Sequence, residues 1–219
     1  RRKEAFKLVS AESAAREAQL KLLRYQLNPH FLFNTLNSIA SLVSTKRSQD
    51  AQSMIAELST FLRFSLESDR NITIPLRDEI EALDLYLRIE QVRFSDRLIV
   101  EQEIDPRALP IQVPSLLLQP LVENAIKHAI GRAEEGGHIL ITAKLTDQQL
   151  VLSVEDSGSG EDEKQPELSD LFDTTGFGLR STAERLENLY GDGFSFNAST
   201  SRLGGLKLAV HLPTRGKQK

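Results

Sequence analysis

Apolar residues recur at helical spacing through the first third of the chain. One series advances by alternating steps of three and four residues, which is the heptad pattern of a coiled coil or helical bundle. It runs through Leu22, Tyr25, Pro29, Leu32, Leu36, Ile39 and Val43. A second amphipathic helix is predicted from about Asp50, with an apolar face of Met54, Ile55, Leu58, Phe61 and Leu62. The polar residues 44–50 between them predict a hairpin turn.

Two helices enclose only a thin core, so this hairpin needs a further partner. A seam this regular would be covered by a second copy of the chain, which gives a dimeric four-helix bundle. The alternative is that the hairpin packs on the neighbouring domain of its own chain. We expect the dimer, and we place the helical domain at residues 1–72.

From Thr73 onward the pattern mixes helices with strands. A helix is predicted to open at Thr73-Ile74-Pro75, with Asp78 and Glu79 in its first turn, and further helices cover residues 115–130 and 178–190. Strands are predicted at residues 98–105, 138–145, 149–155, 194–199 and 206–212, and a mobile loop at residues 160–175. This order predicts an α+β domain over residues 73–213, an α/β sandwich with helices on one face of a mixed sheet, and a tail at residues 214–219.

Composition and charge narrow the class of protein. The 219 residues are 40% hydrophobic and 26% charged, as in a soluble globular protein. Cysteine is absent, which excludes disulfides, cysteine nucleophiles and thiolate metal sites. The net charge of −4 argues against a nucleic-acid partner. It divides into +4 for residues 1–72 and −8 for residues 73–219, which indicates two modules with different tasks.

The first candidate site lies on the first helix, in the sequence Gln26-Leu-Asn-Pro-His-Phe-Leu-Phe-Asn-Thr-Leu-Asn37. At roughly 100° per residue, His30 projects about 140° away from the heptad seam, and Asn34 shares its face one turn later. A neutral imidazole is a good nucleophile near neutral pH because its free nitrogen needs no deprotonation. The alternative is a solvated surface histidine beside the helix-bending Pro29.

The second candidate site lies on the predicted helix at residues 115–130, in the sequence Leu121-Val-Glu-Asn-Ala-Ile-Lys-His-Ala129. Its apolar residues supply a buried face, and Asn124, Lys127 and His128 gather on the polar side. An asparagine oxygen suits Mg²⁺, and a lysine can meet phosphate oxygens. An ordinary amphipathic helix is the plain alternative.

Two glycine-rich segments complete the set. In Val154-Glu-Asp-Ser-Gly-Ser-Gly160, a strand runs into two glycines that let the backbone turn and a flat ligand approach closely. Asp156 there can accept a hydrogen bond from an exocyclic amine such as the N6 of adenine. The sequence Gly176-Phe-Gly-Leu-Arg180 opens a helix, whose N-terminal N–H groups attract phosphate. Each segment alone is compatible with an ordinary loop, but their order would surround one nucleotide.

These residues resemble a known family. The sequence from Gln26 to Asn37 resembles the phospho-acceptor motif of LytS-type sensor histidine kinases. The other three segments resemble the N box and the two glycine boxes of the Bergerat-type ATP-binding domain, which gyrase, MutL and histidine kinases share. The resemblance extends through Pro75-Leu-Arg-Asp-Glu-Ile-Glu81 and spans about residues 22–213.

The resemblance implies a protein-histidine kinase that uses ATP and Mg²⁺. His30 would attack the γ-phosphate of ATP and become phosphohistidine, with Asn34 as a supporting residue. The phosphoryl group would then pass to an aspartate of a response regulator. The implied nucleotide-site residues are Asn124 for Mg²⁺, Lys127 for the phosphates, His128 along the site, Asp156 for adenine, Gly158 and Gly160 for the pocket, and Gly176, Gly178 and Leu179 for the lid.

The resemblance also implies partners and a location. We expect a homodimer and a response-regulator partner. The chain begins with Arg1 and its only methionine is Met54, so we expect a piece of a longer protein with a sensor or membrane segment upstream. The expected location is cytoplasmic, as for the cytosolic part of a membrane-bound receptor.

Three positions bear on competing functions. Phe31 follows the acceptor where many histidine kinases carry an acidic residue, so no general base is assigned, although LytS-type kinases share this Phe. Pro120 stands where gyrase- and MutL-type ATPases carry a catalytic glutamate, which argues against an ATP-hydrolysing clamp. The lid carries only a reduced aromatic element, Leu171-Phe172. The remaining alternative is an ATP-binding scaffold or phosphatase-biased dimer without significant kinase activity.

Overall fold

The structure is a computed structural model that describes residues 29–67, 72–131, 136–146, 149–158 and 177–214. Its chain divides into two compact units, Arg1–Glu67 and Ser68–Lys219. Several predicted features lie outside the described residues: Leu22, Tyr25, Gly160, Gly176, Leu171-Phe172, the predicted loop at 160–175, and the predicted tail after Thr214.

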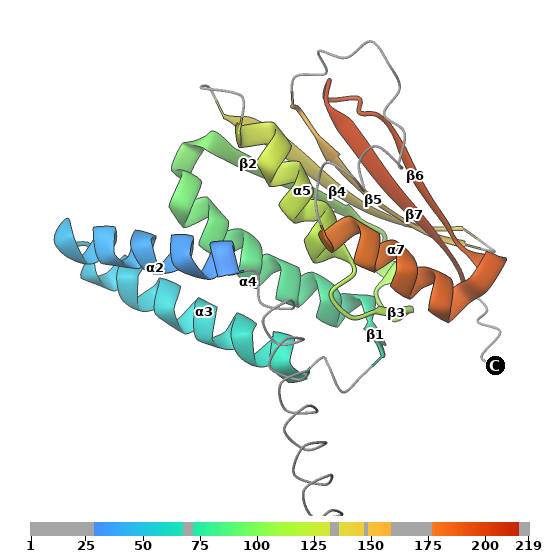
Figure 1. Ribbon diagram of the computed structural model, residues 1–219, viewed down its shortest axis with the longest axis horizontal. Helices are drawn as coiled ribbons and strands as arrows, with labels where there is room; N and C mark the ends of the chain where they lie inside the picture. The colour runs from blue at the N-terminus through green and yellow to red at the C-terminus, as the bar shows by residue number, and fades with distance from the viewer. Residues whose placement is uncertain (1–28, 68–71, 132–135, 147–148, 159–176, 215–219) are drawn as a thin grey trace, which may run out of the picture. The chain divides into compact units, whose positions relative to one another are not determined.

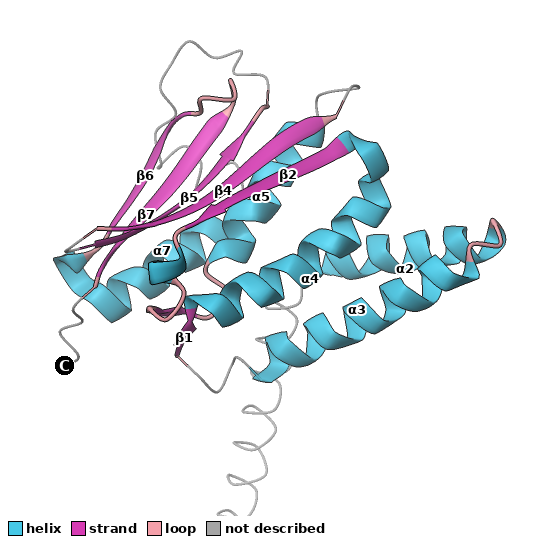
Figure 2. Cartoon of the chain, turned by 180° about the vertical axis from the view of Figure 1, so that it is seen from behind, coloured by secondary structure: helices cyan, strands magenta, loops and turns pink. Residues whose placement is uncertain are grey.

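The helical unit is a hairpin of α2 (Pro29–Ser44) and α3 (Ser48–Glu67), which run side by side in Figures 1 and 2. Pro29 is the first described residue of α2. Lys46 ends the helix at a φ of 62°, and the N–H of Arg47 reaches back to the carbonyl of Leu42 at 2.8 Å. This left-handed C-cap turns the chain within three residues, as the polar sequence predicts.

The hairpin core uses a different face of α2 from the heptad seam. The buried side chains of α2 are Phe31, Thr35 and Leu42, and those of α3 include Ala51, Met54, Leu58 and Phe61. The seam residues Leu36 and Val43 are 55% and 58% exposed. The helix is apolar around more than half of its circumference, so one apolar face closes the hairpin and the other stays on the surface.

The predicted apolar face of α3 is only partly buried within the hairpin. Met54, Leu58 and Phe61 are buried, but Ile55 is half exposed. The contact with α2 covers a narrow stripe, and Ile55 lies one residue, or about 100°, beyond Met54. Ile55 therefore joins the exposed apolar residues of the hairpin.

The second unit is built on a mixed five-stranded sheet of order β2-β4-β5-β7-β6. The first pair is parallel and the other three pairs are antiparallel. The parallel pair requires a crossover, and α5 supplies it between β2 and β4. The strands are β2 (Leu98–Ile104), β4 (Gly137–Leu145), β5 (Gln149–Asp156), β6 (Ser195–Thr200) and β7 (Leu206–Pro213).

Three helices cover one face of this sheet, as Figures 1 and 2 show. They are α4 (Leu76–Phe94), α5 (Leu118–Gly131) and α7 (Phe177–Tyr190), and short 3₁₀ turns lie at Ser95–Arg97, Pro106–Ala108 and Gly191–Gly193. The predicted apolar face of α5 is buried against the sheet through Leu121, Val122, Ala125, Ile126 and Ala129. The α+β architecture with helices on one face is confirmed.

Two helix starts differ from prediction. Thr73-Ile74-Pro75 forms a short strand, β1 (Thr73–Pro75), that pairs antiparallel with β3 (Gln112–Pro114), and α4 begins only at Leu76. The residue before a proline prefers extended backbone, and Pro75 itself has a ψ of 142°. Helix α5 begins at Leu118 instead of Ser115, because residues 115–117 form a turn in which Leu116 has a φ of 54°.

None of the helices among the described residues combines the length and the apolar character needed to cross a bilayer.

Candidate functional site

His30 is displayed on the surface of the helical unit. It lies in the first turn of α2, and the amide nitrogen of Asn34, one turn later, is 3.2 Å from both ring nitrogens. The structure therefore brings the two predicted acceptor-site residues together. An amide beside the ring edge restricts rotation of the imidazole while the helix keeps it in solvent.

Phe31 explains how His30 is held outward. Its side chain is 3% exposed and packs edge-to-face on Phe61, with ring centroids 5.5 Å apart. Successive helical residues point about 100° apart, so anchoring Phe31 in the hairpin core turns His30 toward solvent. The residue after His30 is thus a packing residue and has no group that could accept a proton.

Asn124 is the clearest sign of a ligand site in the second unit. It is 6% exposed, and neither its amide nitrogen nor its amide oxygen has a hydrogen-bond partner among the described residues. A buried polar group without a partner costs roughly 1–3 kcal/mol. Such a side chain in a folded protein calls for a partner outside the described residues, which a ligand or an ordered water can supply.

Asp156 lies at the end of β5 and is held rigidly. Its Oδ1 accepts hydrogen bonds from the N–H of Gly158 at 2.9 Å and of Leu206 at 3.1 Å. Burial raises the pKa of Asp156, against the lowering effects of these two bonds and of His128. Both bonds use the same carboxylate oxygen, and they fix the orientation of the group.

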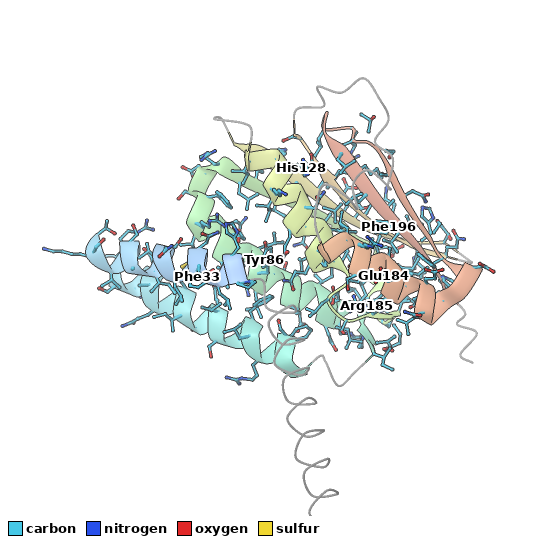
Figure 3. The ribbon with its side chains drawn as sticks, viewed as in Figure 1. Phe33, Tyr86, His128, Glu184, Arg185 and Phe196 are labelled. Carbon is cyan, nitrogen blue, oxygen red and sulfur yellow. The ribbon has the colours of Figure 1, made fainter. Side chains whose placement is uncertain are left out.

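Gly158 closes the space between Asp156 and α5. A Cβ at this position would lie 2.9 Å from Oδ1 of Asp156 and 3.0 Å from the carbonyl oxygen of His128. Only glycine fits such a close approach. The second half of α5, where Figure 3 shows His128, thus lies beside the end of β5.

A loop between β6 and β7, missed by the sequence analysis, also reaches Asp156. The N–H of Gly205 donates to the backbone carbonyl of Asp156 at 3.1 Å, and a Cβ on Gly205 would overlap Oδ1 of Asp156. Glu155 holds the loop, because its Oε2 accepts from the hydroxyl of Ser201 and the N–H of Arg202, each at 3.2 Å. The glycine pair directly before the last predicted strand is the signal that could have found it.

Glu155 is itself a buried ion-pair partner. Lys207 donates to its Oε1 at 3.0 Å. Burial acts to raise the pKa of Glu155, but the bonds from Lys207, Arg202 and Ser201 outweigh it and leave the pKa lowered. Glu155 thus stays ionised and keeps the loop in place.

The remaining predicted residues divide between surface and core. Lys127 is exposed on α5, one turn after Asn124. Gly178 lies near the start of α7, where a Cβ would come 3.6 Å from Cβ of Pro120, so α7 begins beside the first turn of α5. Leu179 is buried on the inner side of α7.

Comparisons with known proteins agree with this arrangement. A family model for histidine kinases matches residues 18–98, and one described as histidine kinase-, DNA gyrase B- and HSP90-like ATPase matches residues 112–216. Sensor protein LytS of Staphylococcus haemolyticus is 35% identical over 204 residues, which cover 91% of this chain and 35% of that protein. Sensor histidine kinase BtsS of Escherichia coli K12 is 34% identical over 91% of this chain and 34% of its own length.

Solved structures show the same fold. The histidine kinase domain of a blue-light activated histidine kinase from Erythrobacter litoralis superposes with a TM-score of 0.52 at 21% identity. That match covers 90% of this chain and 94% of the other. The chain spans about a third of the length of the curated relatives it matches. Sequence and fold together show that the chain belongs to the histidine kinase family, of the LytS type.

Proposed function

We propose that the chain is the catalytic core of a two-component sensor histidine kinase. It transfers the γ-phosphoryl group of ATP to His30, and the phosphoryl group then passes to an aspartate of a response regulator. The observation that carries the proposal is the unpartnered, buried amide of Asn124 in a chain that displays His30 on a separate unit. Membership of the histidine kinase family supports the same reading.

The chemistry at His30 is a nucleophilic substitution at phosphorus. The lone pair of one imidazole nitrogen forms the N–P bond, while the bond from phosphorus to the bridging oxygen breaks and ADP leaves. Asn34, 3.2 Å from the ring, orients it for attack. Phosphoryl transfer depends mainly on such positioning and on neutralising charge.

Nucleotide selection falls to Asp156. A carboxylate accepts a hydrogen bond from the N6 amine of adenine, whereas guanine places a carbonyl at the corresponding position. The two backbone bonds to Oδ1 fix this carboxylate, and Gly158 lets the chain pack closely between Asp156 and α5. We therefore propose that ATP is preferred over GTP.

Mg²⁺ fits the residues around Asn124. The amide oxygen of Asn124 is a hard donor without a partner among the described residues. No group of three or more acidic or histidine side chains suited to a metal occurs in the described part of the chain. This favours an ion held by Asn124 together with nucleotide phosphates over one held by a protein cage. When bound, Mg²⁺ neutralises phosphate charge, and Lys127 adds a positive charge nearby.

The exposed apolar face of the hairpin supports a second copy of the chain as partner. Leu36, Val43 and Ile55 leave apolar surface that a second copy would cover in a four-helix bundle. We propose a homodimer whose protomers pass phosphate to a response regulator, with the chain on the cytosolic side of a sensor.

Labelling with γ-labelled ATP and Mg²⁺ tests the proposal. We expect label that is lost in acid and kept in alkali, which is the behaviour of phosphohistidine. His30→Ala abolishes the label, while His138→Gln, at a histidine in β4, keeps it. Equal labelling of wild type and His30→Ala would refute the assignment. Tight ATP binding without any label would favour the non-catalytic scaffold instead.

A further inference from the structure

The turn at residues 115–117 leads into α5, which carries Asn124 and Lys127. Leu116 adopts a φ of 54°, a left-handed conformation that costs energy for a leucine. A strained turn persists only when contacts with the surrounding structure hold it in place. Two charged side chains from other helices do so here.

Glu79 of α4 holds the N–H groups of the turn. Its Oε2 accepts from Leu116 at 2.7 Å and its Oε1 from Leu118 at 2.8 Å. It lies in the first turn of α4, as predicted, and its side chain is 1% exposed. A carboxylate here satisfies N–H groups that the start of α5 leaves without helical partners, and it complements the helix dipole.

Arg185 of α7 holds the carbonyl groups of the same turn. Its Nη1 donates to the carbonyl oxygen of Ser115 at 2.6 Å and its Nη2 to that of Leu116 at 3.2 Å. Figure 3 shows Arg185 projecting from α7. The positive charge of Arg185 also acts to lower the pKa of Glu79. We call Glu79, Arg185 and the backbone between them the α5 clamp.

The α5 clamp joins the elements that carry the nucleotide-site residues. Helix α5 presents Asn124 two turns beyond the clamp, and α7 begins at the glycine box, where Gly178 lies beside Pro120 of α5. A change at the clamp would therefore alter the spacing between the two helices.

We propose that Glu79 and Arg185 are positioning residues for the nucleotide, which fix α5 and α7 at the spacing that binds ATP. The inference rests on the proposed function. It adds that neither residue touches ATP and that removing either charge weakens ATP binding.

The charge state of Glu79 gives this clamp a pH dependence. Burial raises the pKa of Glu79 to about 7, against the lowering effects of the Leu118 and Leu116 N–H bonds and of Arg185. Burial lowers the pKa of Arg185, an effect that the charges of Glu79 and Tyr190 oppose. A protonated Glu79 loses one acceptor position and its attraction to Arg185, so ATP affinity falls as the pH drops through neutrality.

Equilibrium binding of MgATP from about pH 6 to about pH 8 tests the proposal. Glu79, whose pKa is raised to about 7, titrates in this window. We expect Glu79→Gln to raise the Kd for ATP about tenfold at the upper end, which corresponds to about 1.4 kcal/mol. Arg185→Lys keeps the positive charge but cannot donate to both carbonyl groups in the same geometry. We expect it to raise the Kd for ATP less than Glu79→Gln does. Because ATP itself also titrates, the decisive quantity is the difference in Kd between wild type and Glu79→Gln, and we expect this difference to narrow toward the acid end.

Asp105→Asn is the matched control, because it removes a carboxylate that pairs with Arg107 and belongs to neither side of the clamp. Thermal unfolding of each variant is measured in the same buffers. Variants that lose stability but keep wild-type ATP affinity and pH profile would overturn the clamp's positioning role. A wild type that fails to bind ATP would instead overturn the nucleotide assignment on which the clamp depends.

Discussion

The proposed acceptor site around His30 and the proposed nucleotide site around Asp156 are built in opposite ways. His30 is exposed, and Asn34, which contacts it, is four residues away on the same helix. Asp156 is 2% exposed, and one of its hydrogen-bond donors lies 50 residues further along the chain. One site is set by the rotation of a single helix, and the other by contacts between distant elements.

This difference follows from what each site does. In the proposed function, His30 meets a nucleotide and then a separate protein, so it needs access more than enclosure. The proposed nucleotide site recognises a base and counters the charge of phosphates, which requires groups fixed before the ligand arrives. Substitutions should therefore act locally in the helical unit and over longer distances in the second unit.

The largest effect is expected at Phe31, the core anchor beside the acceptor. Phe31→Ala removes a buried aromatic side chain and should cost the helical unit about 3–5 kcal/mol of unfolding free energy. Phe33→Ala is the matched control on the same helix, because Phe33 is 68% exposed. Circular dichroism during thermal unfolding measures the change. Equal stability of the two variants would contradict the account of how His30 is oriented.

The pH dependence of stability should come next in size. The pKa of Glu79 is raised from 4.5 to about 7 on folding, so the native state binds the extra proton between these values. Unfolding free energy should therefore fall as the pH rises from about 4.5 to about 7, by at most about 3 kcal/mol. Glu79→Gln should flatten this slope in urea unfolding. An unchanged slope would show that Glu79 does not titrate in this range.

Stability and ATP affinity should then respond to acid in opposite directions. Protonation relieves the cost of burying the Glu79 charge, and it also weakens the clamp. A purely structural Glu79 would leave the difference in ATP affinity between wild type and Glu79→Gln constant with pH.

A smaller loss of stability is expected for a substitution at Gly205. The Cβ of Gly205→Ala would overlap Asp156, and relieving such a contact costs roughly 1–3 kcal/mol. Because the shift falls on Asp156, ATP affinity should drop more than stability alone explains. Gly193→Ala serves as the control, since its Cβ would meet only Cγ of Pro213 at an ordinary 3.7 Å. If both variants bind ATP equally well, the loop does not set the position of Asp156.

The smallest change in stability is expected at Asn34. Asn34→Ala removes an exposed contact and should change unfolding free energy by less than about 0.5 kcal/mol. It should nevertheless slow labelling of His30 several-fold, because the ring is no longer oriented. Asn37→Ala, at an exposed asparagine on the same helix, should label at the wild-type rate. A normal rate for Asn34→Ala would remove its supporting role.

The sequence predicts best what depends on neighbours along the chain. The helical hairpin, the five strands of the main sheet and the buried face of α5 follow from periodicity. Which apolar face of α2 closes the hairpin does not, because several faces are apolar and the choice depends on where α3 packs. The strand at Thr73–Pro75 was missed for the same reason, since its partner β3 lies almost forty residues later.

The site shows the same division. The glycine and asparagine boxes could be proposed from order and spacing, and they stay a prediction. The contributions of Glu79, Arg185 and Gly205 could not, because each acts on residues between about 37 and 70 positions away. A glutamate in the first turn of a helix looks like a dipole-complementing surface residue until the chain that buries it is in place.

The central claim is that ATP held in the second unit phosphorylates His30. Tandem mass spectrometry of the full chain after incubation with MgATP, under alkaline conditions that preserve phosphohistidine, tests it most directly. The chain has four histidines, so the site can be assigned among His30, His128, His138 and His211. We predict phosphate on the peptide containing His30, and its loss when Asp156→Asn removes the adenine contact. Phosphate on another histidine, or on His30 independently of Asp156, would contradict the account.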